Sequence, residues 1–167
     1  TLPGGNEWTY TYYTDSSGND ATRDNPCTVA SDPAWQGAAL KTRTAPTPKS
    51  GTGIVEEFVY DGLGRVVATR IGTESWTCTS YDSRGRVTEV ETPAFGGHSA
   101  RSVTYDHDVS NNPLVVSVTD AEGTLTTEID LLGRPVVVED IWAQTLETTY
   151  DQAGRVTSTD GPAGVQA

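Results

Sequence analysis

The sequence predicts an all-β fold, built from consecutive antiparallel β-hairpins that form a curved sheet. Three observations carry this prediction. A short motif recurs every twenty-odd residues, apolar and polar residues alternate, and 17 Gly and 9 Pro residues interrupt the chain. A composition with 35% hydrophobic residues and frequent Gly and Pro fits short strands joined by turns better than long helices.

The recurring motif is a Tyr-Asp pair followed by a Gly-Arg pair. It reads YDGLGRV from Tyr60, YDSRGRV from Tyr81 and YDQAGRV from Tyr150, and weaker copies begin at Tyr105 and Ile129. A catalytic site needs its residues once, so a motif that recurs in one order indicates architecture. The predicted structural repeat residues are Tyr60, Asp61, Gly64, Arg65, Tyr81, Asp82, Gly85, Arg86, Tyr105, Asp106, Asp130, Gly133, Arg134, Tyr150, Asp151, Gly154 and Arg155.

Strands are expected on both sides of each motif. Apolar residues alternate with polar ones in EEFVYDGLGRVVATRI, in LVVSVTD and in TLTTEID. Alternation at period two predicts β-strands with one buried face. Each repeat is therefore interpreted as strand, turn, strand and turn, with stacked repeats sharing a continuous aromatic and aliphatic core.

The letters of the motif predict a specific turn. An aspartate in the first place can accept a hydrogen bond from the N–H two residues on, and the glycine takes a left-handed conformation. The arginine can lie over a tyrosine ring or pair with the turn aspartate. Stacked repeats would align the repeat tyrosines in a ladder. Two further D-x-x-G stretches lie at 15–18 and 120–123, and the second is expected to bend a hairpin at the opposite edge.

The chain is predicted to have two regions without an independent domain boundary. Residues 1–53 form a degenerate repeat, in which Thr14 stands in the place of the tyrosine, and a loop that Trp35 packs onto the sheet. Residues 54–167 form the repeat region, with repeats near positions 60, 81, 105, 129 and 150.

From about Ile54 to Asp160, the YDxxGRV pattern resembles the RHS/YD-repeat proteins. The stretch AWQGAALKTRTAP, followed by a turn rich in Gly and Thr, is similar to actinobacterial members of that family. The resemblance implies long β-strands that spiral into a hollow shell. In bacterial polymorphic toxins the shell encloses a C-terminal toxin, and in the animal teneurins it is an extracellular adhesion scaffold.

The chain departs from the family pattern in several places. The repeat at Tyr105 lacks the Gly and the Arg, and Ile129 replaces a tyrosine. Neither the aspartyl-protease-like segment that follows many bacterial shells nor a toxin domain is visible. The resemblance therefore implies a piece of shell wall, and the absence of Met supports the expectation that the sequence is part of a longer polypeptide.

The expected function is that of a non-catalytic structural segment of a secreted or surface protein. Its expected partners are the rest of a longer YD-repeat chain, or other copies of itself joined through open β edges, together with an enclosed toxin or a cell-surface glycan or protein. The alternative is an extracellular carbohydrate- or receptor-binding module with exposed Trp and Tyr residues. Its candidate ligand platform is Trp76 and Trp142, although their equivalent positions before a YD turn favour packing.

The net charge of −12 argues against nucleic acid and anionic membranes as partners. No apolar run has transmembrane length, and no signal peptide is recognised. Cys27 and Cys78 are either one disulfide, which a secreted setting permits, or two buried thiols, and their spacing does not decide.

No catalytic residue, cofactor or metal is predicted. Asp106, Asp108 and Ser110 alternate as in a calcium loop, but Asn111 occupies the place of the required glycine. His98 and His107 are interpreted as loop residues. Adjacent carboxylates such as Glu56–Glu57 and Glu139–Asp140 point to opposite faces of a strand, so they cannot flank one glycosidic bond.

Overall fold

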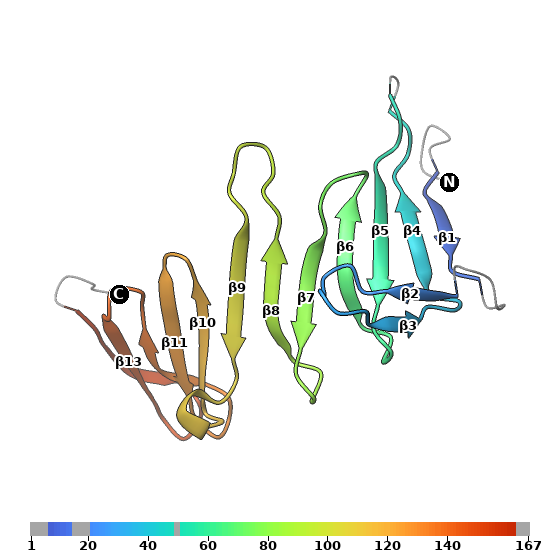
Figure 1. Ribbon diagram of the computed structural model, residues 1–167. Coiled ribbons are helices and arrows are strands. Elements are labelled where there is room, and N and C mark those ends of the chain that lie inside the picture. Colours follow the sequence, from blue (N-terminus) through green and yellow to red (C-terminus); the bar gives the residue numbers. More distant parts are fainter. Residues whose placement is uncertain (1–6, 15–20, 49–50, 163–167) are drawn as a thin grey trace. The chain divides into compact units, whose positions relative to one another are not determined.

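The computed structural model describes residues 7–14, 21–48 and 51–162, and it is almost entirely β (Figure 1). The strands and the single short 3-10 helix are β1 (Thr9–Tyr12), β2 (Thr22–Asp24), β3 (Pro33–Trp35), β4 (Leu40–Thr44), β5 (Val55–Tyr60), β6 (Val66–Ile71), β7 (Thr77–Tyr81), β8 (Val87–Thr92), β9 (Arg101–Asp106), η1 (Val109–Asn111), β10 (Val115–Asp120), β11 (Gly123–Ile129), β12 (Pro135–Glu139), β13 (Thr145–Tyr150) and β14 (Val156–Asp160). The predicted all-β class is confirmed.

The chain divides into two compact units. The first comprises Thr1–Tyr81 and Val90–Ala100, and the second comprises Asp82–Glu89 and Arg101–Ala167. In the first unit the strand order is β1-β4-β5-β6-β7, and in the second it is β9-β10-β11-β12-β13-β14. The registered pairs are antiparallel; from β4 to β7 and from β9 to β14 each pair joins strands that are consecutive in the chain, as in successive hairpins, whereas β1 pairs with β4. The predicted organisation into 1–53 and 54–167 stays a prediction.

A β-bulge marks the start of three repeated turns. The strand register shifts by one residue at the Val59/Tyr60, Glu128/Ile129 and Thr149/Tyr150 steps. The fourth turn residue adopts a left-handed conformation, with φ of 77° at Gly64 and 81° at Gly154. A residue that has a side chain rarely adopts this backbone conformation without strain, which explains why glycine recurs at this position.

The first hairpin, β1–β4, is a hidden copy of the same turn. Its bulge falls between Thr11 and Tyr12, and Tyr12 faces Leu40. The N–H of Tyr13 donates to the carbonyl of Ala39 at 2.9 Å, and the N–H of Ala38, whose φ is 63°, donates to the carbonyl of Tyr13 at 3.2 Å. These bonds have the pattern of the Asp and Gly positions in the repeated turns. Tyr12 therefore takes the tyrosine place, and residues 14–37 are inserted within the turn.

This arrangement corrects the prediction that Thr14 takes the tyrosine place. The predicted turn at 15–18 lies outside the described residues. The turn is not recognisable in the sequence because the inserted residues separate its two sides, and because an alanine, Ala38, occupies the glycine position. A D-x-x-G search recognises only turns whose four positions are consecutive.

The insertion contains a small hairpin, β2–β3, whose strands cross β5 and β4 in the view of Figure 1 and whose connecting loop crosses β6; Arg23 of β2 pairs with Glu57 of β5. The expected anchor, Trp35, is 57% exposed, whereas Gln36 is 1% exposed. The Gln36 amide donates to the carbonyl of Tyr60 at 2.6 Å and accepts from the N–H of Tyr60 at 2.8 Å. The last registered pair between β4 and β5 is Thr42 with Glu57. Beyond it, the side-chain amide of Gln36 makes the two hydrogen bonds to Tyr60 of β5 that the backbone of a neighbouring strand would make.

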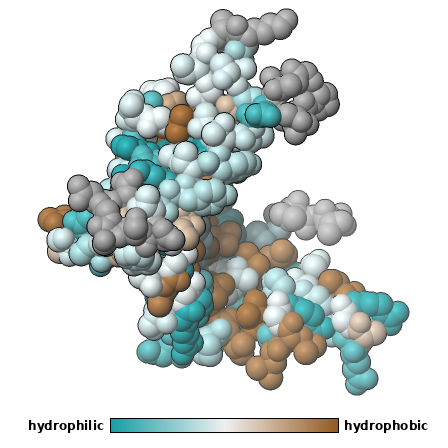
Figure 2. All heavy atoms as spheres, turned by 90° about the vertical axis from the view of Figure 1, so that its right-hand side faces the viewer, coloured by the Kyte–Doolittle hydropathy of each residue, from teal (hydrophilic) through white to brown (hydrophobic). Residues whose placement is uncertain are grey.

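Buried hydrophobic residues are confined to the first unit. Val59, Val67 and Ala68 form a cluster against which Cys27, Trp76 and Tyr81 pack. Among the described residues of the second unit, no hydrophobic side chain is buried. The predicted continuous core is therefore wrong. The sheet of the second unit is not covered by a second layer of the described chain, so its apolar side chains remain accessible. Brown hydrophobic spheres lie at the surface among hydrophilic ones in Figure 2.

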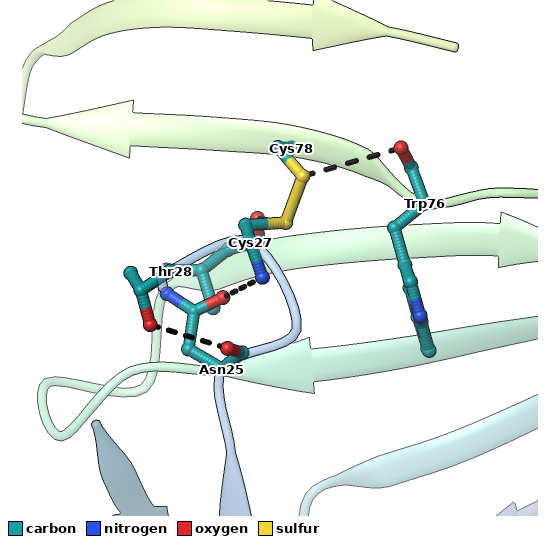
Figure 3. Close-up of a disulfide and its surroundings, with 6 residues drawn as sticks. Asn25, Cys27, Thr28, Trp76 and Cys78 are labelled. Atoms are coloured by element: carbon teal, nitrogen blue, oxygen red, sulfur yellow. Dashed lines mark hydrogen bonds between the residues drawn. A yellow bond between two sulfur atoms is a disulfide. The ribbon is translucent and has the colours of Figure 1, made fainter. Parts of the chain in front are cut away.

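Cys27 and Cys78 form a disulfide, so the structure decides between the two alternatives (Figure 3). The bond joins the inserted segment to β7. The side-chain oxygen of Asn25 accepts a hydrogen bond from the N–H of Cys27 at 3.0 Å and shapes the loop at this point. The insertion is therefore fixed to the sheet at two places, by the disulfide and by Gln36.

We predict that the double substitution Cys27→Ala and Cys78→Ala lowers the free energy of unfolding by about 4 kcal/mol, because the bridge closes a loop with a sequence separation of 51. Denaturant unfolding followed by circular dichroism measures the loss. Reduced wild-type protein is the control and should match the double variant. Equal stability of the oxidised and reduced protein would contradict the prediction.

Candidate functional site at the repeated turns

The repeated turns are the candidate functional site, and the same aspartate geometry recurs in them. One carboxylate oxygen of Asp61 accepts from the N–H groups of Leu63 and Arg65, both at 2.9 Å, and the other accepts from Nε of Arg65 at 2.7 Å. The same three bonds recur at Asp82, Asp130 and Asp151, with distances of 2.7 to 3.0 Å. Each carboxylate therefore holds both the turn backbone and the guanidinium that follows.

The arginine connects one repeat to the next. The guanidinium of Arg65 lies 4.5 Å from the ring centroid of Tyr81, and that of Arg134 lies 4.4 Å from the ring centroid of Tyr150. The hydroxyl of Tyr81 donates to the carbonyl of Val66 at 2.9 Å, and that of Tyr150 donates to the carbonyl of Pro135 at 2.8 Å. We call this set the Asp–Arg–Tyr contact: the aspartate and arginine of one turn, and the tyrosine of the following repeat. In each of these contacts the tyrosine ring packs against the arginine of the preceding turn.

The repeats that lack part of the motif, at Tyr105 and Ile129, change at the same contact positions. Nε2 of His107 lies 2.7 Å from the carbonyl of Val87, the residue after Arg86, where a tyrosine hydroxyl stands in the other contacts. Nε2 must carry a proton to donate there. The turn after Tyr105 contains no arginine, and the following repeat has Ile129 in place of a tyrosine. The arginine of one repeat and the tyrosine of the next are thus lost together.

The hydrogen bonds change the acidity of the turn aspartates. The backbone N–H of Arg86, more than any other group, lowers the pKa of Asp82 to about 2. The corresponding backbone bonds from Arg134 and Arg155 lower the pKa values of Asp130 and Asp151. At Asp61 burial raises the pKa, but the hydrogen bonds from Arg65 and Leu63 outweigh it and the net direction is downward.

The pKa of Asp151 is also lowered by the charge of Arg134, which belongs to the preceding turn. A favourable charge interaction thus crosses from one repeat to the next. It supplements the ring contact between Arg134 and Tyr150.

Turns at the opposite end of the hairpins are of two kinds. Asp120 faces Gly123 across a tight bend between β10 and β11, as expected from the sequence. A second turn, at 140–144, was missed. The carboxylate of Asp140 accepts from the N–H groups of Trp142 and Gln144, both at 2.9 Å, and Ala143 has a φ of 59°. This is the repeated turn with alanine in the glycine place and glutamine in the arginine place.

Trp76 and Trp142 do not have equivalent surroundings. The ring centroid of Trp76 lies 4.4 Å from the guanidinium of Arg70 and 5.4 Å from that of Arg23, and both arginines pair with Glu57. Trp142 lies at the tip of its turn and is 75% exposed. Their role as a ligand platform stays a prediction.

Several other residues considered for chemistry have ordinary structural partners. The carboxylate of Asp106 accepts from the N–H of Asp108 at 3.0 Å, and Ser110 and Asn111 adopt left-handed conformations in a polar turn. The Phe95–His98 pair closes the loop between β8 and β9. Within 7–14, 21–48 and 51–162, no group of three or more His, Cys, Asp or Glu residues could hold a metal ion.

The described residues include no helix of the length and hydrophobicity that crossing a membrane requires.

Part of the chain that contains these turns matches a known family of repeats. Residues 81–127 match the family model named RHS Repeat. This part of the chain is therefore similar to RHS repeats. The matched stretch contains the turn of Asp82 and the departing repeat at Tyr105, and the turns of Asp61, Asp130 and Asp151 extend the RHS pattern on both sides. A search of the curated proteins found no match.

We predict that acid weakens the fold through the aspartates of the repeated turns. Because their pKa values are lower in the folded chain than the value of about 3.9 in an unfolded one, the unfolded chain takes up protons first. The stabilisation is complete above about pH 4 and is lost as the pH falls towards 2. Asp82→Asn should be less stable than wild type at pH 6 and should lose less stability between pH 5 and pH 2.

Denaturant unfolding across this range measures both effects. Glu122→Gln removes one exposed carboxylate from a different turn and controls for the change in net charge. A wild-type stability that does not change between pH 5 and pH 2 would show that the aspartates do not act in this way.

We also predict a coupling between Arg134 and Tyr150. A double-mutant cycle with Arg134→Ala and Tyr150→Leu should give about 0.5 to 1 kcal/mol, since the guanidinium lies over a partly exposed ring. The mismatched pair Arg65→Ala and Tyr150→Leu joins residues of different units and should give a coupling near zero. Equal values in the two cycles would refute the contact.

Proposed function

We propose that this chain is a non-catalytic wall segment of a YD-repeat shell. The wall either encloses a toxin cargo or presents a surface outside the cell. The observation that carries the proposal is the recurrence of the Asp–Arg–Tyr contact, because it joins neighbouring hairpins in the same way at two places, Arg65 with Tyr81 and Arg134 with Tyr150. Such a rule serves the construction of an extended sheet, whereas catalysis needs a single asymmetric set of residues.

The distribution of apolar residues supports a wall. The second unit leaves Leu125, Leu131, Leu132 and Leu146 between 40% and 89% exposed, and none of its described hydrophobic side chains is buried. An isolated domain of this kind would have little hydrophobic stabilisation. A wall segment gains further burial from the parts of the shell that cover it.

The disulfide supports a location outside the reducing cytoplasm. Disulfides persist in secreted and surface proteins and are rare where thiols are kept reduced. The Cys27–Cys78 bridge also fastens the inserted hairpin over the cluster around Val59. A wall exposed to an extracellular medium benefits from such a covalent restraint.

The native polypeptide tests the proposal. An antibody raised against residues 51–162 should isolate a polypeptide longer than this chain, and electron microscopy should show a hollow particle. Brief protease treatment should leave the shell and its contents intact, whereas Arg65→Ala combined with Arg134→Ala should render the contents cleavable. Arg84→Ala, at an exposed turn tip, is the matched control. A particle without an interior, or contents that are cleaved at the same rate in all variants, would contradict an enclosing wall.

A further inference from the structure

The loop between β2 and β3 displays a single aliphatic side chain, that of Val29. Val29 is fully exposed, more so than any other large hydrophobic residue that the structure describes. The residues around it, 28–33, are all exposed, and the N–H groups of 29–31 have no hydrogen-bond partner within the described chain. Unpaired backbone groups of this kind are available to a protein that binds a peptide segment in extended form.

Both sides of the exposed segment are fastened to the fold. On the amino side, Cys27 is bonded to Cys78 of β7, and its N–H donates to the side-chain oxygen of Asn25 at 3.0 Å (Figure 3). On the carboxyl side, the N–H of Asp32 donates to the carboxylate of Asp24 at 2.5 Å, and β3 pairs with β2. The fixed sides lower the conformational entropy that a binding partner would have to remove.

The residue types of the segment select a class of partner. Residues 28–31 read Thr-Val-Ala-Ser, so all four are small and none is charged. A serine protease places one substrate side chain in its S1 pocket, and the small pocket of the elastase type takes a short aliphatic side chain such as that of Val29. The trypsin type needs a basic side chain, and residues 24–37 contain no Lys or Arg.

We propose that the Val29–Ala30 peptide bond is a recognition and cleavage site for a serine protease of the elastase type, with Val29 in the S1 pocket. The serine oxygen of the protease attacks the carbonyl carbon of Val29, and the amine of Ala30 leaves with a proton. Water then hydrolyses the acyl-enzyme ester, so that Val29 ends as a carboxylate and the serine is regenerated. The inference goes beyond the proposed structural function and does not depend on it.

The arrangement of the loop keeps the cleaved protein in one piece. The amino-terminal fragment retains β1, which pairs with β4, and Cys27, which is bonded to Cys78. The other fragment begins at Ala30 and retains Gln36, which bonds to Tyr60 of β5. The disulfide thus joins the two fragments across the cut, and a wall cleaved at this bond keeps its sheet.

Digestion of the oxidised 167-residue chain with pancreatic elastase tests the site. Mass spectrometry should detect the fragments 1–29 and 30–167, which migrate together in denaturant without reductant and separate after reduction. Val29→Asp should lower kcat/KM at this bond about tenfold or more, because an apolar pocket rejects a charged side chain. Val29→Ala should still be cleaved there, since the pocket accepts short aliphatic side chains.

Leu63→Asp is the matched control. Leu63 is also a highly exposed aliphatic residue, but it lies in a repeated turn whose carboxylate, that of Asp61, binds its N–H. This variant should be cleaved at Val29 at the wild-type rate, and circular dichroism checks that all variants are folded. An intact Val29–Ala30 bond in wild type, or equal rates for wild type and Val29→Asp, would overturn the proposal. Neither result would affect the shell proposal, which the particle image tests separately.

Discussion

The structure depends on a carboxylate that accepts three hydrogen bonds in a turn of five residues. Two of these bonds fix the backbone of the turn, and the third fixes the guanidinium that follows. Because the bonds stabilise the ionised form, the aspartate stays charged over nearly the whole pH range. The arginine is consequently held in one direction before it meets the tyrosine of the next repeat. A flexible arginine would lose more side-chain entropy on making the same contact.

The two units use this turn in different settings. In the first unit, the inserted segment covers β5 and β6 and buries a small cluster around Val59. In the second unit, the described chain provides no such cover, and stability comes from strand pairing and the polar contacts of the turns. Surface ion pairs contribute little singly, but a pair such as Arg134 with Asp130, whose arginine also lies over a tyrosine ring, is among the more favourable arrangements.

The fold class and the repeated turns followed from the sequence because each depends on local patterns. Alternation identified the strands, and Asp and Gly at fixed spacing identified the turns around Gly64, Gly85, Gly133 and Gly154. The turns at Ala38 and Ala143 escaped notice because alanine there adopts a conformation that sequence rules assign to glycine. Gln36 escaped because its importance lies in a contact with Tyr60 that is distant in sequence. The disulfide likewise depends on where the insertion folds back, which cysteine spacing does not specify.

The insertion at the first hairpin has a consequence for how such proteins diversify. The bonds of Tyr13 with Ala38 and Ala39 close the hairpin in the usual way although residues 14–37 are inserted between the two sides of the turn. The cost of closing a longer loop grows slowly with its length, so a turn whose two ends are already bonded can accept a new segment. Turn tips of YD repeats are therefore suitable graft points, at which evolution or an engineer can add a folded module without altering the strand ladder beneath it.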